Sequence, residues 1–139
     1  MDKWNGDADV KKGLKNLTAT IAYFGGKKVD DEGAKLAARY LGLNTALTTL
    51  RLYDNSIGDA GAAAIGKALA SNSTLTTLYV CYGARTTCRV GDVGAAAFLE
   101  ALPGHPTLTH LYLQSDKISN AMREKLKAAK SAKLTTLDL

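Results

Sequence analysis

An arginine and three tyrosines, spaced at intervals along the chain, are the side chains best suited to contact another molecule. Arg51, Tyr53, Tyr79 and Tyr112 each follow a leucine directly. Tyrosine and arginine are common among the residues that dominate protein interfaces, because they bury a large area and can still form hydrogen bonds. The simpler interpretation is that the rings pack against one another across a sheet, which stabilises it without a partner. The two roles are compatible, and the pattern indicates binding chemistry.

Catalysis has little support in the sequence. His110, Ser115 and Asp116 are the residue types of a nucleophilic triad, but no strained turn or set of oxyanion donors accompanies them. Residues 25–28 read Gly-Gly-Lys-Lys and lack the GxxxxGKS/T pattern of a phosphate-binding loop. We therefore predict a protein that is not an enzyme and needs no cofactor.

Two cysteines, Cys81 and Cys88, flank residues 82–87. In a chain expected inside the cell, such a pair favours free thiols. A disulfide that closes this loop is the alternative. Metal binding by the pair together with His110 is disfavoured, because the spacing matches no ligand signature.

A repeated tetrapeptide predicts the elements that would position these residues. Leu-Thr-Thr-Leu occurs at 47–50, 75–78 and 134–137, and a near copy, Leu-Thr-His-Leu, occurs at 108–111. Self-similarity at a period of about 20–50 residues indicates a solenoid. Each frame predicts a short strand, and the apolar residues that follow at helical spacing predict a helix. No single repeat can bury its apolar face alone, so we expect the repeats to stack around one continuous core.

Glycines near the start of the predicted helices set the register of the repeats. Gly33, Gly61 and Gly94 each precede the next leucine frame by 14 residues. In the third repeat, Leu75 is the first residue and Gly94 lies near the start of the helix. Counting the same number of residues back from Gly33 reaches Leu14, which is therefore the predicted start of the first repeat. The predicted repeats are 14–46, 47–74, 75–107 and 108–133, with a half-repeat 134–139 and an N-terminal cap at 1–13. The first and third repeats then carry five extra residues just after the strand.

Acidic residues at the start of the predicted helices are expected to cap them. Asp59 can accept the free amide hydrogens in the first turn of its own helix. The matching positions in the other repeats are held by Asp31, Asp92 and Asn120.

Residues 47–57 spell the pattern LxxLxLxxNxI, which ends with Asn55 and Ile57. This segment resembles the ribonuclease-inhibitor class of leucine-rich repeats, and residues 57–75 are similar to repeats of NOD-like receptors. The resemblance implies an α/β leucine-rich repeat solenoid, a short right-handed α/β horseshoe arc with a parallel sheet on the concave face and helices on the convex face. The counterparts of Asn55 are Ala22, Gly83 and Asp116, so the ladder of asparagines that binds the turns in this family is expected to be nearly absent.

The leucines of such strands point into the core, and the residues between them point onto the concave face. One predicted ladder consists of Thr18, Arg51, Tyr79, Tyr112 and Asp138, and a second consists of Thr20, Tyr53, Cys81 and Gln114. From these ladders we predict that the partner-binding residues are Arg51, Tyr53, Tyr79, Tyr112, Gln114 and Asp138. The threonines of the repeated frame are expected to make contacts between strands rather than with a partner.

The two predicted insertions, within 23–28 and 82–89, would protrude from the same rim of the sheet. Functional contacts concentrate on loops that a rigid scaffold holds. The predicted rim contacts are Lys27, Lys28, Arg85 and Arg89. The alternative is that both segments are tolerated variation in loop length.

Charge and composition narrow the class of partner. The net charge is +5, and lysine and arginine crowd residues 117–133. This excess favours a protein partner with acidic character, whereas nucleic acid is disfavoured because no base-stacking motif accompanies the charge. No apolar run reaches the roughly 18–20 residues of a membrane span. The start of the chain shows no signal peptide, so a cytoplasmic location is expected.

The chain ends at Leu139, in the middle of a repeat, which predicts an unpaired strand edge. Self-association, docking through this edge, or membership of a longer array would each explain it. Two hypotheses follow. The protein is either a module that binds a protein partner through its concave face and basic rim, or a structural subunit docked permanently in a larger complex.

Overall fold

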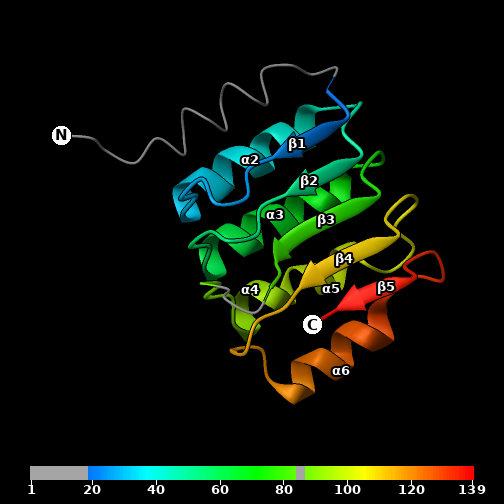
Figure 1. Ribbon diagram of the computed structural model, residues 1–139. Coiled ribbons are helices and arrows are strands. Elements are labelled where there is room, and N and C mark those ends of the chain that lie inside the picture. Colours follow the sequence, from blue (N-terminus) through cyan, green and yellow to red (C-terminus); the bar gives the residue numbers. More distant parts are fainter. Residues whose placement is uncertain (1–18, 84–86) are drawn as a thin grey trace.

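Five parallel strands form a single sheet, and helices cover one of its faces (Figure 1). The computed structural model describes residues 19–83 and 87–139. The predictions that concern the cap at 1–13, Leu14, Thr18 and Arg85 lie outside the described residues. The strands are β1 (Ile21–Tyr23), β2 (Thr49–Arg51), β3 (Thr77–Cys81), β4 (His110–Leu113) and β5 (Thr136–Asp138). The helices are α2 (Asp31–Leu43), α3 (Asp59–Ser71), α4 (Asp92–Ala96), α5 (Phe98–Ala101) and α6 (Asn120–Ala129).

The order of the strands in the sheet follows their order in the chain, and every neighbouring pair is parallel. Each crossover between strands carries one helix, or two short ones, and the helices pack against one another in chain order. This arrangement confirms the predicted α/β repeat solenoid with a parallel sheet. The face of the sheet that is turned away from the helices is called the open sheet face below.

Leucines from the repeated frame fill the layer between sheet and helices. Leu50, Leu78 and Leu111 pair on adjacent strands and have no exposed surface. Helix residues such as Ile65 and Phe98 are buried in the same hydrophobic cluster. The prediction of one continuous core is therefore confirmed for the described repeats.

The register of the first repeat differs from the prediction. Ile21 pairs with Thr49, and the Thr48 hydroxyl donates to the Thr20 carbonyl 28 residues earlier. The residue equivalent to Leu47 is therefore residue 19, not Leu14, and the first repeat has no insertion. The leucine frame misled here because Ala22 and Phe24 occupy the buried positions that leucines hold in the other strands. The spacing of 33 residues between the equivalent threonines that precede β3 and β4 confirms the insertion in the third repeat.

Aspartates at the helix starts cap the next helix rather than their own. Asp31 Oδ1 accepts hydrogen bonds from the backbone N–H groups of Gly58 and Gly61, at 2.7 and 3.0 Å. Asp59 Oδ1 likewise accepts from Gly91 and Gly94, both at 2.8 Å. The prediction that Asp59 caps its own helix is wrong, because its carboxylate points across the helix layer to the following repeat.

The same offset applies to Asp92, and the prediction that Asn120 caps a helix start is also wrong. Asp92 Oδ1 accepts from the Ser119 N–H at 2.7 Å, at the start of α6. Asn120 is the first residue of α6, and Ser119 is the residue that caps it, through the Met122 N–H. Asp30 caps α2, the helix that directly follows it, because its side chain accepts a hydrogen bond from the Gly33 N–H. Each junction between helices thus receives a polar side chain for its free amide groups.

A buried asparagine holds the turn after β2. Asn55 Oδ1 accepts from the N–H groups of Lys27 and Val29, and Asn55 Nδ2 donates to the carbonyls of Phe24 and Leu52. The 28-residue offset makes Lys27 the counterpart of Asn55 in the first repeat, so the prediction of Ala22 is wrong. In the third repeat the insertion moves Cys88, not Gly83, into this place.

Threonines of the repeated frame connect adjacent strands. The hydroxyls of Thr48, Thr76, Thr109 and Thr135 each donate to a carbonyl of the preceding repeat, at 3.0–3.2 Å. Their side chains are therefore engaged by the sheet itself, which confirms the structural role predicted for them.

Candidate partner-binding face

One row of side chains crosses the open sheet face at the same level of all five strands. The pairing places Tyr23, Arg51, Tyr79, Tyr112 and Asp138 side by side on β1 to β5. The structure therefore brings together four residues that the sequence predicted for one ladder. Tyr23 holds the place predicted for Thr18, which follows from the corrected register of the first repeat.

Five tyrosines form a continuous aromatic group on this face, called the tyrosine cluster below. Its members are Tyr23, Tyr53, Tyr79, Tyr82 and Tyr112. The rings of Tyr79 and Tyr112 are stacked, with centroids 4.2 Å apart and planes 3° from parallel. All other ring pairs meet edge to face, at centroid distances of 5.1–6.0 Å. Aromatic pairs of this kind add roughly 0.5–1.5 kcal/mol each, so the cluster is a stiff surface.

Tyr82 enters the cluster because β3 contains an irregularity. The pairing of β3 with β4 shifts between Tyr79 and Cys81, so that Cys81 pairs with Leu113. Cys81 is then 1% exposed and lies in the core. The prediction that Cys81 lies on the concave face is wrong, since the extra residue of the β-bulge turns it inward and turns Tyr82 outward. The sequence signal for Tyr82 was its position at the start of the insertion.

The two cysteines are bonded to each other. Cys81 and Cys88 form a disulfide between residues whose Cα atoms are 5.7 Å apart. The expectation of free thiols is therefore wrong in this structure. The disulfide joins Cys81, in the bulge of β3, to Cys88 at the end of the insertion.

Arg51 lies in the middle of the aromatic residues. Its guanidinium carbon is 5.9 Å from the ring centre of Tyr23 and 5.4 Å from that of Tyr79. Both are cation–π distances. Arg51 Nε is buried and has no hydrogen-bond partner. The arginine is thus held between two rings from neighbouring strands and keeps its positive charge at the open face.

The other end of the row is anionic. Asp138 on β5 accepts a hydrogen bond from Gln114 Nε2 at 2.8 Å, and Gln114 Oε1 accepts from the Gly83 N–H at 3.0 Å. Gln114 therefore joins the loop after β3 to β5. Both residues were predicted to contact a partner, and both lie beside the tyrosine cluster.

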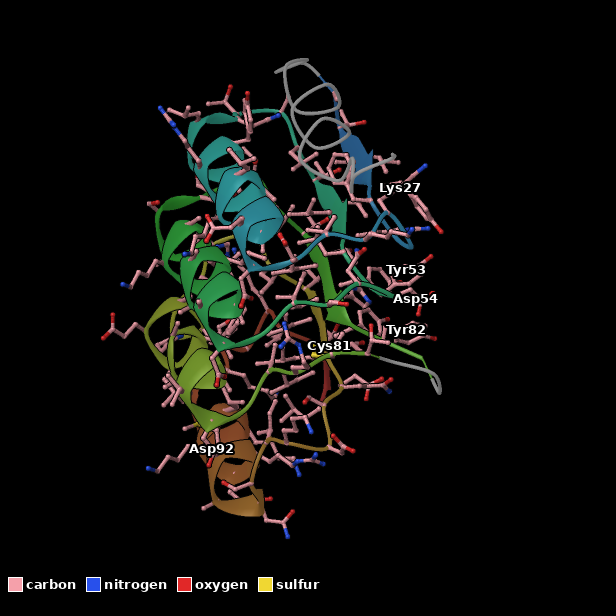
Figure 2. The ribbon with its side chains drawn as sticks, turned by 90° about the vertical axis from the view of Figure 1, so that its left-hand side faces the viewer. Lys27, Tyr53, Asp54, Cys81, Tyr82 and Asp92 are labelled. Carbon is pink, nitrogen blue, oxygen red and sulfur yellow. A yellow bond between two sulfur atoms is a disulfide. The ribbon has the colours of Figure 1, made fainter. Side chains whose placement is uncertain are left out.

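The predicted rim residues are spread over the loops after the strands. Lys27 lies at the same edge of the molecule as Tyr53, Asp54 and Tyr82 (Figure 2). Lys27 and Lys28 are exposed. Arg89 is also exposed, and its Nη2 donates to the Ser56 carbonyl at 3.1 Å, which ties the third repeat to the second. Lys27, Lys28 and Arg89 therefore stay predicted rim contacts.

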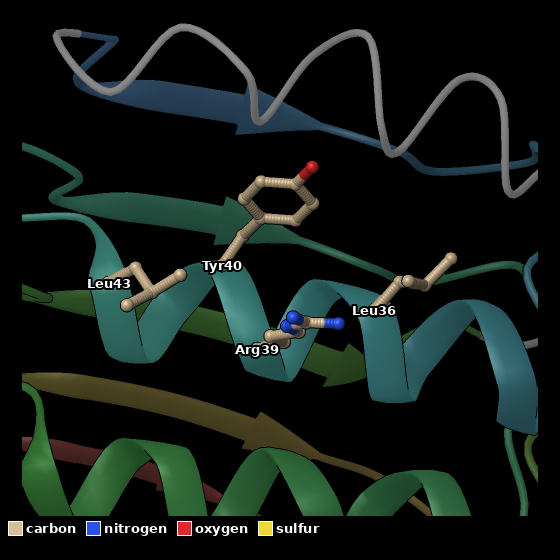
Figure 3. A pocket seen from close by; sticks show the side chains of 4 residues that line it. All are labelled: Leu36, Arg39, Tyr40 and Leu43. Carbon is tan, nitrogen blue, oxygen red and sulfur yellow. The ribbon is translucent and has the colours of Figure 1, made fainter.

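The helix layer carries a separate surface feature, away from the open sheet face. Leu36, Arg39, Tyr40 and Leu43 of α2 line a shallow pocket (Figure 3). Leu43 is 63% exposed there. The pocket belongs to the outer side of α2 and holds none of the residues of the tyrosine cluster.

The pKa values of the Tyr53 and Tyr112 hydroxyls are raised. The Tyr53 hydroxyl donates to the Tyr23 hydroxyl at 2.9 Å, and this hydrogen bond is the main cause that raises the pKa of Tyr53, while Arg51 acts in the opposite direction. Burial is the main cause that raises the pKa of Tyr112, and a hydrogen bond with Tyr79 adds to it.

We expect Tyr53 and Tyr112 to ionise at higher pH in the folded protein than in the unfolded chain. Because their folded pKa values are raised, their contribution to stability is fully present below pH about 10 and is lost as pH rises through the folded values. Ultraviolet absorbance of the phenolate, recorded during an alkaline titration with and without urea, measures this difference. Superimposable titration curves in the two conditions would contradict it, and the Tyr53→Phe variant identifies the residue.

The fold and the open face together define the class of protein. A leucine-rich repeat family model matches residues 43–66. No curated protein sequence matches the chain. The solved structure of "Leiomodin-1 Actin-Binding Site 2 (ABS2)" aligns with a TM-score of 0.78 over 99% of this chain and 80% of its own length, at 18% sequence identity. The chain thus has the leucine-rich repeat fold, with an aromatic surface on its open sheet face. Among the described residues, no helix is long and apolar enough to cross a membrane.

Proposed function

We propose that the protein is a non-catalytic interaction module that binds a protein partner through the open sheet face. The tyrosine cluster is the observation that carries this proposal. Packing between strands would explain rings that are covered by their neighbours, but Tyr23 remains 50% exposed and Tyr82 40% exposed. Ile21, on the same strand as Tyr23, is 60% exposed. Exposed apolar surface of this kind on a rigid scaffold is typical of a binding site.

Charge supports a partner with acidic character. The net charge of the protein is +5, Arg51 lies in the row on the open sheet face, and Lys27 lies at the same edge of the molecule as Tyr53 and Tyr82 (Figure 2). The partner-binding residues in this proposal are Arg51, Tyr53, Tyr79, Tyr82, Tyr112, Gln114 and Asp138, with Lys27 and Lys28 at the rim. Membership of the ribonuclease-inhibitor class and a cytoplasmic location are parts of the same proposal. Actin is one candidate partner, because the leiomodin structure that shares the fold is an actin-binding site.

The double variant Tyr79→Ala with Tyr112→Ala is expected to lose the partner. Truncation of two central aromatic residues of an interface weakens binding by at least about 30-fold, since each such residue contributes roughly 2 kcal/mol or more. Wild type and variant serve as paired baits in affinity purification with quantitative mass spectrometry. Proteins that the wild type retains and the variant loses are the partners.

The control removes exposed apolar side chains from the helix layer instead. Leu43 and Val93 are 63% and 74% exposed on α2 and α4. Leu43→Ala with Val93→Ala should leave the captured proteins unchanged. Circular dichroism checks that both double variants are folded. The proposal fails if the tyrosine variant retains every protein that the wild type retains.

The alternative is a structural subunit docked through an open sheet edge. Among the described residues, β5 pairs with β4 and has no strand on its other side. An unpaired edge is a ready template for another chain. If this alternative holds, the double variant Tyr79→Ala with Tyr112→Ala still binds the other members of the complex. The same paired purification therefore distinguishes docking through the sheet edge from binding through the open sheet face.

A further inference from the structure

We propose that the open sheet face binds an extended segment of its partner that carries an acidic residue and a basic residue four positions apart. The acidic residue faces Arg51 and the basic residue faces Asp138. An apolar or aromatic residue midway between them covers Tyr79 and Tyr112. This inference rests on the proposed function and specifies the chemistry of the partner.

The charge of Arg51 is not neutralised within the described part of the chain. The ion pairs among the described residues are Lys35–Glu32 and Lys127–Glu124, both within helices. Arg51 contacts Tyr23, Tyr53 and Tyr79, none of which carries a carboxylate. The rings orient the guanidinium but supply no counter-charge. A carboxylate of the partner would supply it, with the bidentate geometry that arginine favours.

The charge of Asp138 is likewise not paired with a cation among the described residues. Its carboxylate accepts from the neutral amide of Gln114. The carboxylate is half-buried on the last strand of the sheet. A cationic side chain of the partner is the group that this site lacks.

The distance between the two charges follows from the sheet. Arg51, Tyr79, Tyr112 and Asp138 are paired in sequence on four consecutive strands. Three strand spacings of about 4.8 Å separate the ends of this row by roughly 14 Å. An extended chain advances about 3.3–3.6 Å per residue, so four residues cover the distance.

The alternation of side chains favours an extended segment over a helix. In an extended chain, residues i, i+2 and i+4 point to the same side. They would therefore meet Arg51, the stacked pair of Tyr79 and Tyr112, and Asp138 in turn. A helix rises about 1.5 Å per residue and would need nine or ten residues for the same span.

Selection from a displayed library of random twelve-residue peptides tests this directly. The library is selected on the wild type and sorted for binding that Tyr79→Ala with Tyr112→Ala abolishes. We expect these peptides to be enriched in an acidic and a basic residue four positions apart with an apolar residue between them. On Arg51→Glu they should bind at least 10-fold more weakly. Selection on Arg51→Glu itself should replace the acidic position by a basic one.

A matched control and two contrary outcomes complete the test. Arg39 is an exposed arginine on the outer side of α2, and Arg39→Glu should leave the selected peptides unchanged. Tyrosine-dependent peptides that lack the charge pair, or that place it at helical spacing, overturn the inference and leave the proposed function standing. Peptides that bind equally well to the tyrosine double variant count against both.

Discussion

Replacing Asn55 by alanine is expected to lower the free energy of unfolding by about 3–5 kcal/mol. Asn55 is 5% exposed, and its amide group binds two backbone N–H groups and three backbone carbonyls of two adjacent turns. The substitution leaves these groups without partners in a buried place. Each unsatisfied buried group costs roughly 1–3 kcal/mol, and a loss of this size is exceptional for a single substitution. Urea denaturation followed by circular dichroism measures the change.

Asp116 offers the matched control. It occupies the place of Asn55 in the fourth repeat, two residues before a buried isoleucine, but it is exposed. Asp116→Ala should change the free energy of unfolding by about 0.5 kcal/mol or less, as exposed substitutions usually do. Equal losses for the two variants would show that the turn after β2 does not depend on the asparagine.

The substitution Gly94→Ala is expected to destabilise the protein by about 1–3 kcal/mol. A Cβ atom on Gly94 would lie 2.8 Å from Asp59 Oδ1 and 2.9 Å from Asp59 Cα. The backbone of α3 cannot shift away from the added Cβ atom unless the whole helix moves. The Gly94 N–H would also lose its hydrogen bond to Asp59. Overpacking of this kind costs roughly 1–3 kcal/mol and outweighs the gain of about 1 kcal/mol that alanine normally gives over glycine in a helix.

Gly42→Ala is the control for this prediction. Gly42 lies near the end of α2, and beyond its chain neighbours and the backbone of its own helix no atom of the described residues lies within 4 Å of the position that its Cβ would take. The same chemical change should therefore stabilise the protein by a few tenths to about 1 kcal/mol. Thermal denaturation of the two variants should shift in opposite directions. Gly94→Ala as stable as the wild type would refute the close approach of α3 and α4.

The fold was predictable because its main signal is local. Each leucine frame specifies a strand, and the period between frames specifies the stacking. The positions of Leu47, Leu75, Leu108 and Leu134, all buried, follow from this pattern alone. The pattern was misleading where other apolar residues replace leucine, as Ala22 and Phe24 do in and beside β1.

The binding face was predictable only in part, because its membership depends on pairing between strands. Tyr79 and Tyr112 could be placed on one ladder from their leucine neighbours. Tyr23 needed the register of β1, and Tyr82 needed the bulge of β3, and neither is visible in a single strand.

A set of buried polar contacts at the other end of the strands was also missed. Asn44, Asn72 and His105 each accept two backbone N–H groups at the start of the next strand. Asn72 Nδ2 and His105 Nε2 also bond helix carbonyls of the preceding repeat, Leu41 and Leu69. The signal was present in the sequence, since each of the three residues stands three positions before a leucine of the frame.

The capping of α3 and α4 by the preceding repeat has a consequence for how the protein unfolds. Asp31 and Asp59 satisfy the amide groups of α3 and α4, so one repeat cannot open without exposing the amides of the next. In repeat proteins the coupling between neighbours decides whether the array melts in one step or frays from an end. Strong coupling at every described junction makes the array cooperative. Slow, similar rates of amide hydrogen exchange from α2 to α4 are the signature of that cooperativity.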